Sequence, residues 1–528
     1  MFLGNTSVLY RVKECNAKDV EAVNLEFLRQ CFEINEARGI LYLLKTMSGP
    51  ENLVGLLDEF SLELSEKIEG AKTSKEKNQI FVRILRMLNN LHEQEHSIRF
   101  SILNHLKAEH LVALAILWRH ALYTSSFNTV LDRILIAIRE KNFSLYGDLI
   151  VKKPEDRAVF FEALSAYNRL FEVLSAMSAH EATELMVSDI KNLPKSQSIR
   201  NAIAWMEYLQ HPEASLDTKN VLKQQISDMA IREEISSDLM ALYPKGSVLL
   251  TPKTTQEALI ALMCQTYRLF YDQSLSPSCQ ELERHYQDDI VPLADTNLDL
   301  VSLRTEGLIN VQRHVFYNDL DGSSTYHYFR RRHELLPDWR IDSYPTFEVF
   351  SNFSENTGVA IRMIANLPKF QSVASVDIET YNLEMKHQPS VFVFRGHSYH
   401  VVDSLKYLNQ NTRLALIGSC GGFENLETVL ARSPYTQMIL TKGTGTAWIN
   451  NLLVPAINKL ILSDAPELNW LEFKESLRSE LEQAMQRFPN RDKILHIFDS
   501  FYVFPHENIG FIMMRSWMQY LGNYGDRN

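Results

Sequence analysis

The fold can be predicted from two stretches, Ser-Val-Phe-Val-Phe-Arg-Gly-His at 390–397 and Arg-Leu-Ala-Leu-Ile-Gly-Ser-Cys-Gly-Gly at 413–422. Each is a run of apolar, β-favouring residues that stops at a reactive side chain, His397 or Cys420. Continuous apolar runs of this length are typical of buried parallel strands. Open α/β sheets bind ligands at the carboxyl ends of such strands. If the two strands are neighbours, an imidazole and a thiol project from one edge, as a cysteine nucleophile with a histidine base requires.

The sequence around these stretches alternates between strand and helix patterns. We expect further strands at 314–319, 346–350, 359–365 and 436–441, and helices at 323–335, 375–386, 402–409, 423–432, 446–462 and 469–487. A short β-prone run follows at 501–504. Strands that alternate with helices of this length predict a mainly parallel sheet flanked by helices.

The first half of the chain has a different pattern, which is helical almost throughout residues 17–240. Phe160, Leu164, Tyr167, Phe171 and Leu174 fall on one face of a helix with 3.6 residues per turn. The sequence therefore predicts an α + α/β fold in three parts. These are a helical bundle or helical-repeat-like region at 1–245, a connecting segment at 246–308 with a helix near 254–272, and an α/β domain at 309–528 with its core at about 309–465.

Composition excludes several classes of protein. The 528 residues are too many for one core, and 45% hydrophobic with 23% charged residues is typical of a soluble globular protein. A net charge of −11 argues against a nucleic-acid partner held by phosphate contacts. No signal peptide is visible at the N-terminus. The richest apolar stretch, 111–122, contains Arg119 and His120 and is too short to span a bilayer, so we expect no membrane insertion.

The five cysteines are widely and irregularly spaced, with no Cys-x-x-Cys pair. This spacing indicates neither a disulfide framework nor a zinc ribbon, and it favours a reducing cytoplasm. We interpret Cys15, Cys31, Cys264 and Cys279 as inert core residues. His397, His400 and Cys420 lack a fourth ligand at a suitable spacing, so we expect no metal and no cofactor.

Residues 396–422 contain the groups that acyl transfer through a thioester needs. An imidazole beside Cys420 would take the thiol proton and leave a thiolate. Gly421 and Gly422 would let a substrate backbone approach. Backbone N–H groups at the start of the next helix would form an oxyanion hole.

This layout resembles the caspase-like cysteine peptidases, the superfamily of caspases, metacaspases, gingipain, clostripain, separase and the CHAT proteases. Phe394-Arg395-Gly396-His397 corresponds to the family's histidine motif and Leu416–Gly422 to its cysteine motif, within residues 309–465. The resemblance implies that His397 is the general base and acid and that Cys420 is the nucleophile. The backbone N–H groups of Ser398, Cys420 and Gly421 would then supply the oxyanion hole. The family usually has glycine after the histidine, whereas here Gly396 precedes it. His400, three residues further on, stays open as an alternative base.

In this family the residues after the first strand commonly help line the specificity pocket. Asp319 and Asp321 occupy that region, which leads us to expect cleavage after Arg or Lys. The interpretation of 319–322 as a polar turn is equally open. Gly443 and Thr444, in a glycine-containing loop before a helix, are candidates to line the substrate cleft.

Two other functions stay open. Gly418-Ser419-Cys420-Gly421-Gly422 fits the cysteine version of a nucleophile elbow, for which His496 or His506 would be the base. Alternatively, a caspase-like module without turnover would act as an interaction scaffold. In the peptidase interpretation the substrate is a protein or peptide. The helical half would dock the target or a regulatory protein.

Overall fold

The computed structural model describes residues 50–91, 94–118, 124–140, 154–182, 195–211, 213–240, 252–271, 274–287, 290 and 297–525. Its contacts divide the chain into two compact units, Met1–Val151 and Lys152–Asn528. This boundary differs from the one that the sequence predicts near residue 245. The reason is that helices between residues 154 and 271 pack against helices that follow the sheet, and so belong to its unit.

The described part of the first unit is helical, as predicted. Its helices are α4 (Pro50–Gly70), α5 (Ser74–Asn90), α6 (His96–Ser101), α7 (Ala108–Trp118) and α8 (Thr124–Arg139). Helix α5 begins at a capping box, in which the Thr73 hydroxyl accepts from the Glu76 N–H and the Glu76 carboxylate accepts from the Thr73 N–H. Ile84 and Met87 are buried on its inner face.

The second unit begins with six described helices, α10 (Pro154–Ala166), α11 (Leu170–Ser175), α13 (Lys195–Gln210), α14 (Leu216–Met240), α15 (Pro252–Tyr271) and α16 (Pro277–Tyr286). The apolar face predicted from Phe160 to Leu174 is not one helix. Helix α10 ends at Ala166, and Asn168 has a positive φ of 57°, which a helix cannot accommodate. The apolar period continues across this break, so periodicity alone did not reveal it.

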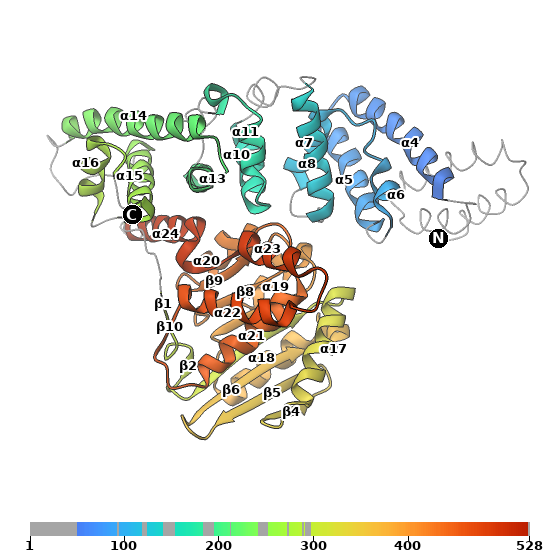
Figure 1. The fold of residues 1–528 in the computed structure, drawn as a ribbon, viewed down its shortest axis with the longest axis vertical. Helices are drawn as coiled ribbons and strands as arrows, with labels where there is room; N and C mark the ends of the chain where they lie inside the picture. Colours follow the sequence, from blue (N-terminus) through green and yellow to red (C-terminus); the bar gives the residue numbers. More distant parts are fainter. Residues whose placement is uncertain are drawn as a thin grey trace, which may run out of the picture. The chain divides into compact units, whose positions relative to one another are not determined.

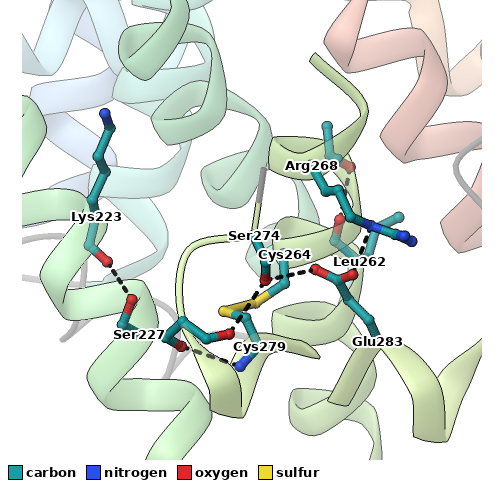
Figure 2. The surroundings of a disulfide bond; sticks show 10 residues. Lys223, Ser227, Leu262, Cys264, Arg268, Ser274, Cys279 and Glu283 are labelled. Carbon is teal, nitrogen blue, oxygen red and sulfur yellow. Dashed lines mark hydrogen bonds and ion pairs between the residues drawn. A yellow bond between two sulfur atoms is a disulfide. The ribbon is translucent and has the colours of Figure 1, made fainter. Parts of the chain in front are cut away.

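Cys264 on α15 and Cys279 on α16 form a disulfide, with 5.6 Å between their Cα atoms (Figure 2). The prediction that both are unlinked core residues is therefore wrong. The Ser276 side chain caps α16 by accepting from the Cys279 N–H, which fixes the start of that helix beside α15. The two cysteines are 15 positions apart in the sequence, and this spacing does not indicate that they pair.

The remaining residues build a nine-stranded sheet. Its main path runs in the order β11-β9-β8-β7-β3-β6-β5-β4, and β2 pairs with β3. The strands are β2 (Arg304–Thr305), β3 (Ile309–Phe316), β4 (Trp339–Ser343), β5 (Phe347–Ser354), β6 (Val359–Asn366), β7 (Val391–Arg395), β8 (Leu414–Ile417), β9 (Gln437–Thr441) and β11 (Tyr502–Val503). A separate two-stranded sheet pairs β1 (Asn297–Asp299) with β10 (Glu467–Asn469).

The sheet is mixed, whereas the sequence predicts a mainly parallel one. Strands β6, β3, β7, β8 and β9 are parallel, and antiparallel strands flank them at both edges. The difference arises at a tight turn that ends at Gly358, whose φ is +70° and whose N–H donates to the Ser354 carbonyl. This turn makes β5 and β6 a hairpin, and strand β4, which was not predicted, extends it.

The side on which successive parallel strands are added to the sheet changes between β3 and β7. In chain order they are β3, β6, β7, β8 and β9, but in space β6 lies on one side of β3 and the other three lie on the opposite side. Such a switch point leaves a crevice at the carboxyl ends of the two central strands, where open α/β sheets bind ligands. The prediction that the two marked segments are neighbouring strands is confirmed, because β7 and β8 pair in parallel.

Helices cover both faces of this sheet (Figure 1). One face packs in a large apolar core against α17 (Leu320–Glu334), α21 (Ala447–Ile461), α22 (Trp470–Met485) and α23 (Arg491–Phe501). The other face packs against α18 (Ala374–Met385). Helices α20 (Leu426–Arg432) and α24 (Ile509–Gly525) contact each other, and α24 also contacts α13 and α15. The helix predicted at 402–409 is instead a series of short turns, with α-helical geometry at Val401–Ser404.

Within the described ranges, the structure holds no helix of the length and apolar character needed to cross a membrane.

Candidate active site

The pairing of β7 with β8 places His397 and Cys420 at one edge of the sheet. Phe394 is the register partner of Ile417, and each of the two candidate residues follows its strand partner by three positions. Neighbouring strands lie about 4.8 Å apart. The two loops therefore start from adjacent points beside the switch point, and both candidates are part-exposed.

Two aspartates that follow β3 hold the His397 loop. The His397 backbone N–H donates to Asp319 Oδ2 at 3.0 Å, and the His397 Nδ1 atom lies 3.3 Å from Asp321 Oδ2. Asp319 Oδ1 accepts from the Gly322 N–H at 2.6 Å and thereby caps α17. Both oxygens of Asp319 are therefore used to build the loop. Asp321 is 63% exposed and orients the ring of His397, which is 23% exposed.

The close approach of these loops explains why glycine precedes the histidine here. A Cβ atom on Gly396 would lie 2.8 Å from the Tyr317 Cβ and 3.2 Å from Asp319 Oδ2. The φ of Gly396 is +157°, which side chains rarely tolerate. Gly396 is thus required for the contact between the β3 and β7 loops.

His400 lies on the same loop, in a different setting. Its ring stacks on Tyr317 with centroids 3.4 Å apart and planes 18° from parallel. Burial lowers the pKa of His400 to about 4, despite the nearby Asp319 carboxylate. His397 is oriented through its ring nitrogen by a carboxylate, whereas His400 is held through its ring face. This contrast favours His397 as the base.

The Cys420 loop is shaped by a second loop, between β9 and α21. The Cys420 Sγ lies 4.0 Å from the Gly445 carbonyl oxygen. Asn450 Nδ2 donates to the Gly418 carbonyl at 2.8 Å, and the Tyr502 hydroxyl donates to Asn450 Oδ1 at 3.0 Å. Burial raises the pKa of Tyr502, so this hydroxyl keeps its proton and stays a donor. A Cβ on Gly445 would overlap the Gly418 carbonyl, so the two loops pack backbone to backbone.

Gly443 joins the Cys420 loop to the helices at the start of the unit. Its carbonyl accepts from the Gly421 N–H at 2.8 Å, and its own N–H donates to the Ala166 carbonyl at the end of α10 at 3.0 Å. The Tyr167 ring packs 3.4 Å from the point where a Gly421 Cβ would be. The Gly421 N–H, predicted as an oxyanion donor, therefore has an acceptor within the chain.

The other predicted residues take varied positions. Ser398 begins the turn directly after His397, and Thr444 is part-exposed in the loop between β9 and α21, so both belong to this edge. His496 lies on α23 with its Nδ1 3.3 Å from the Ser500 hydroxyl. His506 lies in a short turn after β11, and burial lowers its pKa.

Sequence reasoning missed Asn450 and Tyr502, which set the shape of the cysteine loop. Asn450 lies on α21 and Tyr502 on β11, both well beyond Cys420 in the sequence, and neither belongs to a motif. Asparagine in the first turn of a helix that follows a glycine loop would have been the available signal, but it is a weak one.

Among the described residues one group of possible metal ligands lies close together, Glu69, Glu109 and His110 in the first unit. Lys107 already pairs with Glu69 there. Comparisons of the chain with protein-family models, with curated proteins and with solved structures give no match. The function must therefore be argued from the site itself.

Proposed function

We propose that the chain is a caspase-like cysteine peptidase, with Cys420 as nucleophile and His397 as general base. The observation that carries the proposal is the register of β7 and β8, which brings an imidazole and a thiol to one sheet edge. In chain order the histidine follows the third and the cysteine follows the fourth of the five parallel strands, so each lies at the carboxyl end of its strand.

In this mechanism His397 takes the thiol proton and Cys420 Sγ attacks the carbonyl carbon of a peptide bond. The oxyanion that forms would be stabilised by backbone N–H groups of the two loops, with Cys420 and Ser398 as the donors we favour. His397 then protonates the leaving amine, and a thioester remains on Cys420. Water, deprotonated by His397, attacks the thioester and releases the acid, which regenerates the thiol.

Asp321 supports this role of His397. With Nδ1 of the ring paired to the carboxylate, the proton on that nitrogen is fixed, and Nε2 is the nitrogen that can accept a proton from the thiol. Asp321 is a positioning residue in this proposal.

The preference for Arg or Lys remains a prediction. Asp319 and Asp321, on which it depends, both have partners on the His397 loop, and Asp321 is also 63% exposed. A cytoplasmic location also remains a proposal, but the cysteine argument for it no longer holds, because Cys264 and Cys279 are bonded. A regulatory partner for the helical region remains part of the proposal. The contact between α10 and Gly443 supports it, because it links the helices to the cysteine loop.

A thiol-reactive peptide probe tests the proposal. We expect it to label the wild-type protein on Cys420 and to leave Cys420→Ala unlabelled. We expect His397→Ala to slow peptide cleavage by roughly 10²- to 10⁴-fold, because general base catalysis contributes about that much. His400→Ala is the matched control on the same loop and should lose less than about tenfold.

Other outcomes point to the alternatives. If His496→Ala or His506→Ala abolished cleavage and His397→Ala did not, the nucleophile-elbow mechanism would replace this one. If the probe labelled the wild type no faster than Cys420→Ala, the interaction scaffold would be the better interpretation.

A further inference from the structure

A cavity of about 400 Å³ lies between α17, α21 and α22. This volume falls in the range of small-molecule and side-chain binding pockets. Its walls are mostly apolar, and they include Tyr328, Trp448, Leu452, Leu481, Ala484 and Met485. Trp448 is 45% exposed and Tyr328 is 51% exposed, so two of the lining rings are open to solvent.

The cavity borders the proposed catalytic edge on two sides. Ser324, on its α17 wall, donates to the carbonyl of Asp321, the residue that pairs with His397. Ala447, on its α21 wall, follows Gly445 by two residues, and the Gly445 carbonyl is the one that lies 4.0 Å from Cys420 Sγ. A residue spans at most about 3.5 Å, so Ala447 lies within about 7 Å of Gly445 along the chain.

The lining of the cavity disfavours a basic occupant. None of the lining residues is acidic. Behind Asn451, which also lines the cavity, two guanidinium groups converge: Arg395 donates to the Asn451 side chain at 2.5 Å and Arg332 donates to its carbonyl at 2.9 Å. Neither guanidinium has a carboxylate partner in the part of the chain that the structure describes. A lysine or arginine side chain would leave water and find no acidic partner on these walls.

The same arrangement disfavours an acidic occupant. Arg395 is 9% exposed, and its guanidinium is turned to the Asn451 amide, which stands between it and the cavity. A carboxylate placed in the cavity would leave water and gain apolar walls, which costs free energy. An aromatic or large aliphatic side chain gains from those walls through its buried area.

We propose that this cavity is the specificity pocket and that it binds a large apolar side chain, such as Phe, Leu or Met, of the residue that precedes the cleaved bond. This inference rests on the proposed peptidase function for its link to cleavage. Trp448 forms the outer wall, supported by Phe488 at 4.9 Å between ring centroids. The walls from α21 and α22 determine how large a side chain fits.

The first test measures binding without turnover. Blocked peptide amides that differ only at one residue (Phe, Leu, Ala, Lys or Asp) are titrated into Cys420→Ala, and the Trp448 fluorescence is followed as the difference from Cys420→Ala/Trp448→Phe. We expect the Phe and Leu peptides to bind at least tenfold more tightly than the Lys and Asp peptides. Equal or tighter binding of Lys or Asp peptides, or no binding of any peptide, would overturn the inference.

A second set of variants tests the position of the pocket. Ala484→Phe fills the cavity and should weaken binding of the Phe peptide about tenfold, with little effect on the Ala peptide. Leu471→Ala removes an exposed apolar residue of α22 that does not line the cavity, and it should change nothing. If both variants behaved alike, the pocket would be elsewhere. If Phe peptides bound as expected but the wild type cleaved none of them, the peptidase proposal would fail while the pocket stood.

Discussion

Asp319 and Asp321 stand two residues apart and have different partners. Asp319 caps α17 and accepts from the His397 backbone, whereas Asp321 contacts the His397 ring. A pattern of Asp-Leu-Asp-Gly does not distinguish a cap from a positioning carboxylate or a pocket wall, because all three use an exposed aspartate after a strand. The sequence therefore located these residues but not their roles.

These contacts predict that the two aspartates separate activity from stability. Asp321→Asn should lower kcat by about tenfold or more, because the His397 ring loses its orienting charge, and should leave the melting temperature unchanged. Asp319→Ala should lower the free energy of unfolding by about 1 kcal/mol through loss of the helix cap. Steady-state kinetics and thermal unfolding of both variants check this. A larger loss of stability in Asp321→Asn than in Asp319→Ala would contradict the assignment.

Among the elements, the central strands were the most predictable from sequence. The runs that end at Arg395 and Ile417 are continuous, apolar and bounded by glycine or polar residues, so their type and neighbour relation followed from pattern. The hairpin of β4 and β5 could not be predicted from the sequence pattern. Arg340, Asp342 and Ser343 give β4 a polar, part-exposed surface that is typical of a loop, and only pairing with β5 makes it a strand.

The disulfide between α15 and α16 leads to a prediction at the scale of elements. Cys279→Ser should lower the free energy of unfolding of this unit by about 3 kcal/mol, the value expected for a closed loop of 15 residues. Urea unfolding with and without a reductant measures it. The buried Cys264 thiol that remains should then react with a thiol reagent only after unfolding. If the reductant leaves the wild-type midpoint unchanged, the two cysteines are not bonded in solution.

At the scale of the whole molecule, the boundary between the two units gives a further prediction. A fragment of residues 152–528 keeps α10 and α13 against the elements that follow the sheet and should fold and react with the peptide probe. A fragment of residues 246–528 lacks these helices, and buried faces such as Phe423 and the inner side of α24 would be exposed. We expect the second fragment to be insoluble or to unfold at a lower temperature. Equal melting temperatures would favour the boundary near residue 245.

The sequence predicted that the chain has a helical first half and a later α/β part, but it placed the division at the change of pattern. The division that the tertiary contacts give differs from the one that the sequence pattern gives. The reason is that a helix belongs to the unit whose surface buries its apolar face. Arg200 on α13 pairs with Glu427 on α20, and the whole sheet region up to β8 lies between them in the sequence. No local sequence pattern indicates such an ion pair.

Gly443 accepts a hydrogen bond from the Gly421 N–H and donates one to the Ala166 carbonyl. These two bonds connect the C-terminal end of α10 to the backbone beside the Cys420 thiol. A displacement of α10 would break the hydrogen bond from the Gly443 N–H to the Ala166 carbonyl. It would then weaken the hydrogen bond from the Gly421 N–H to the Gly443 carbonyl. The position of the Cys420 loop therefore depends, through the single residue Gly443, on a helix from a distant, earlier part of the chain.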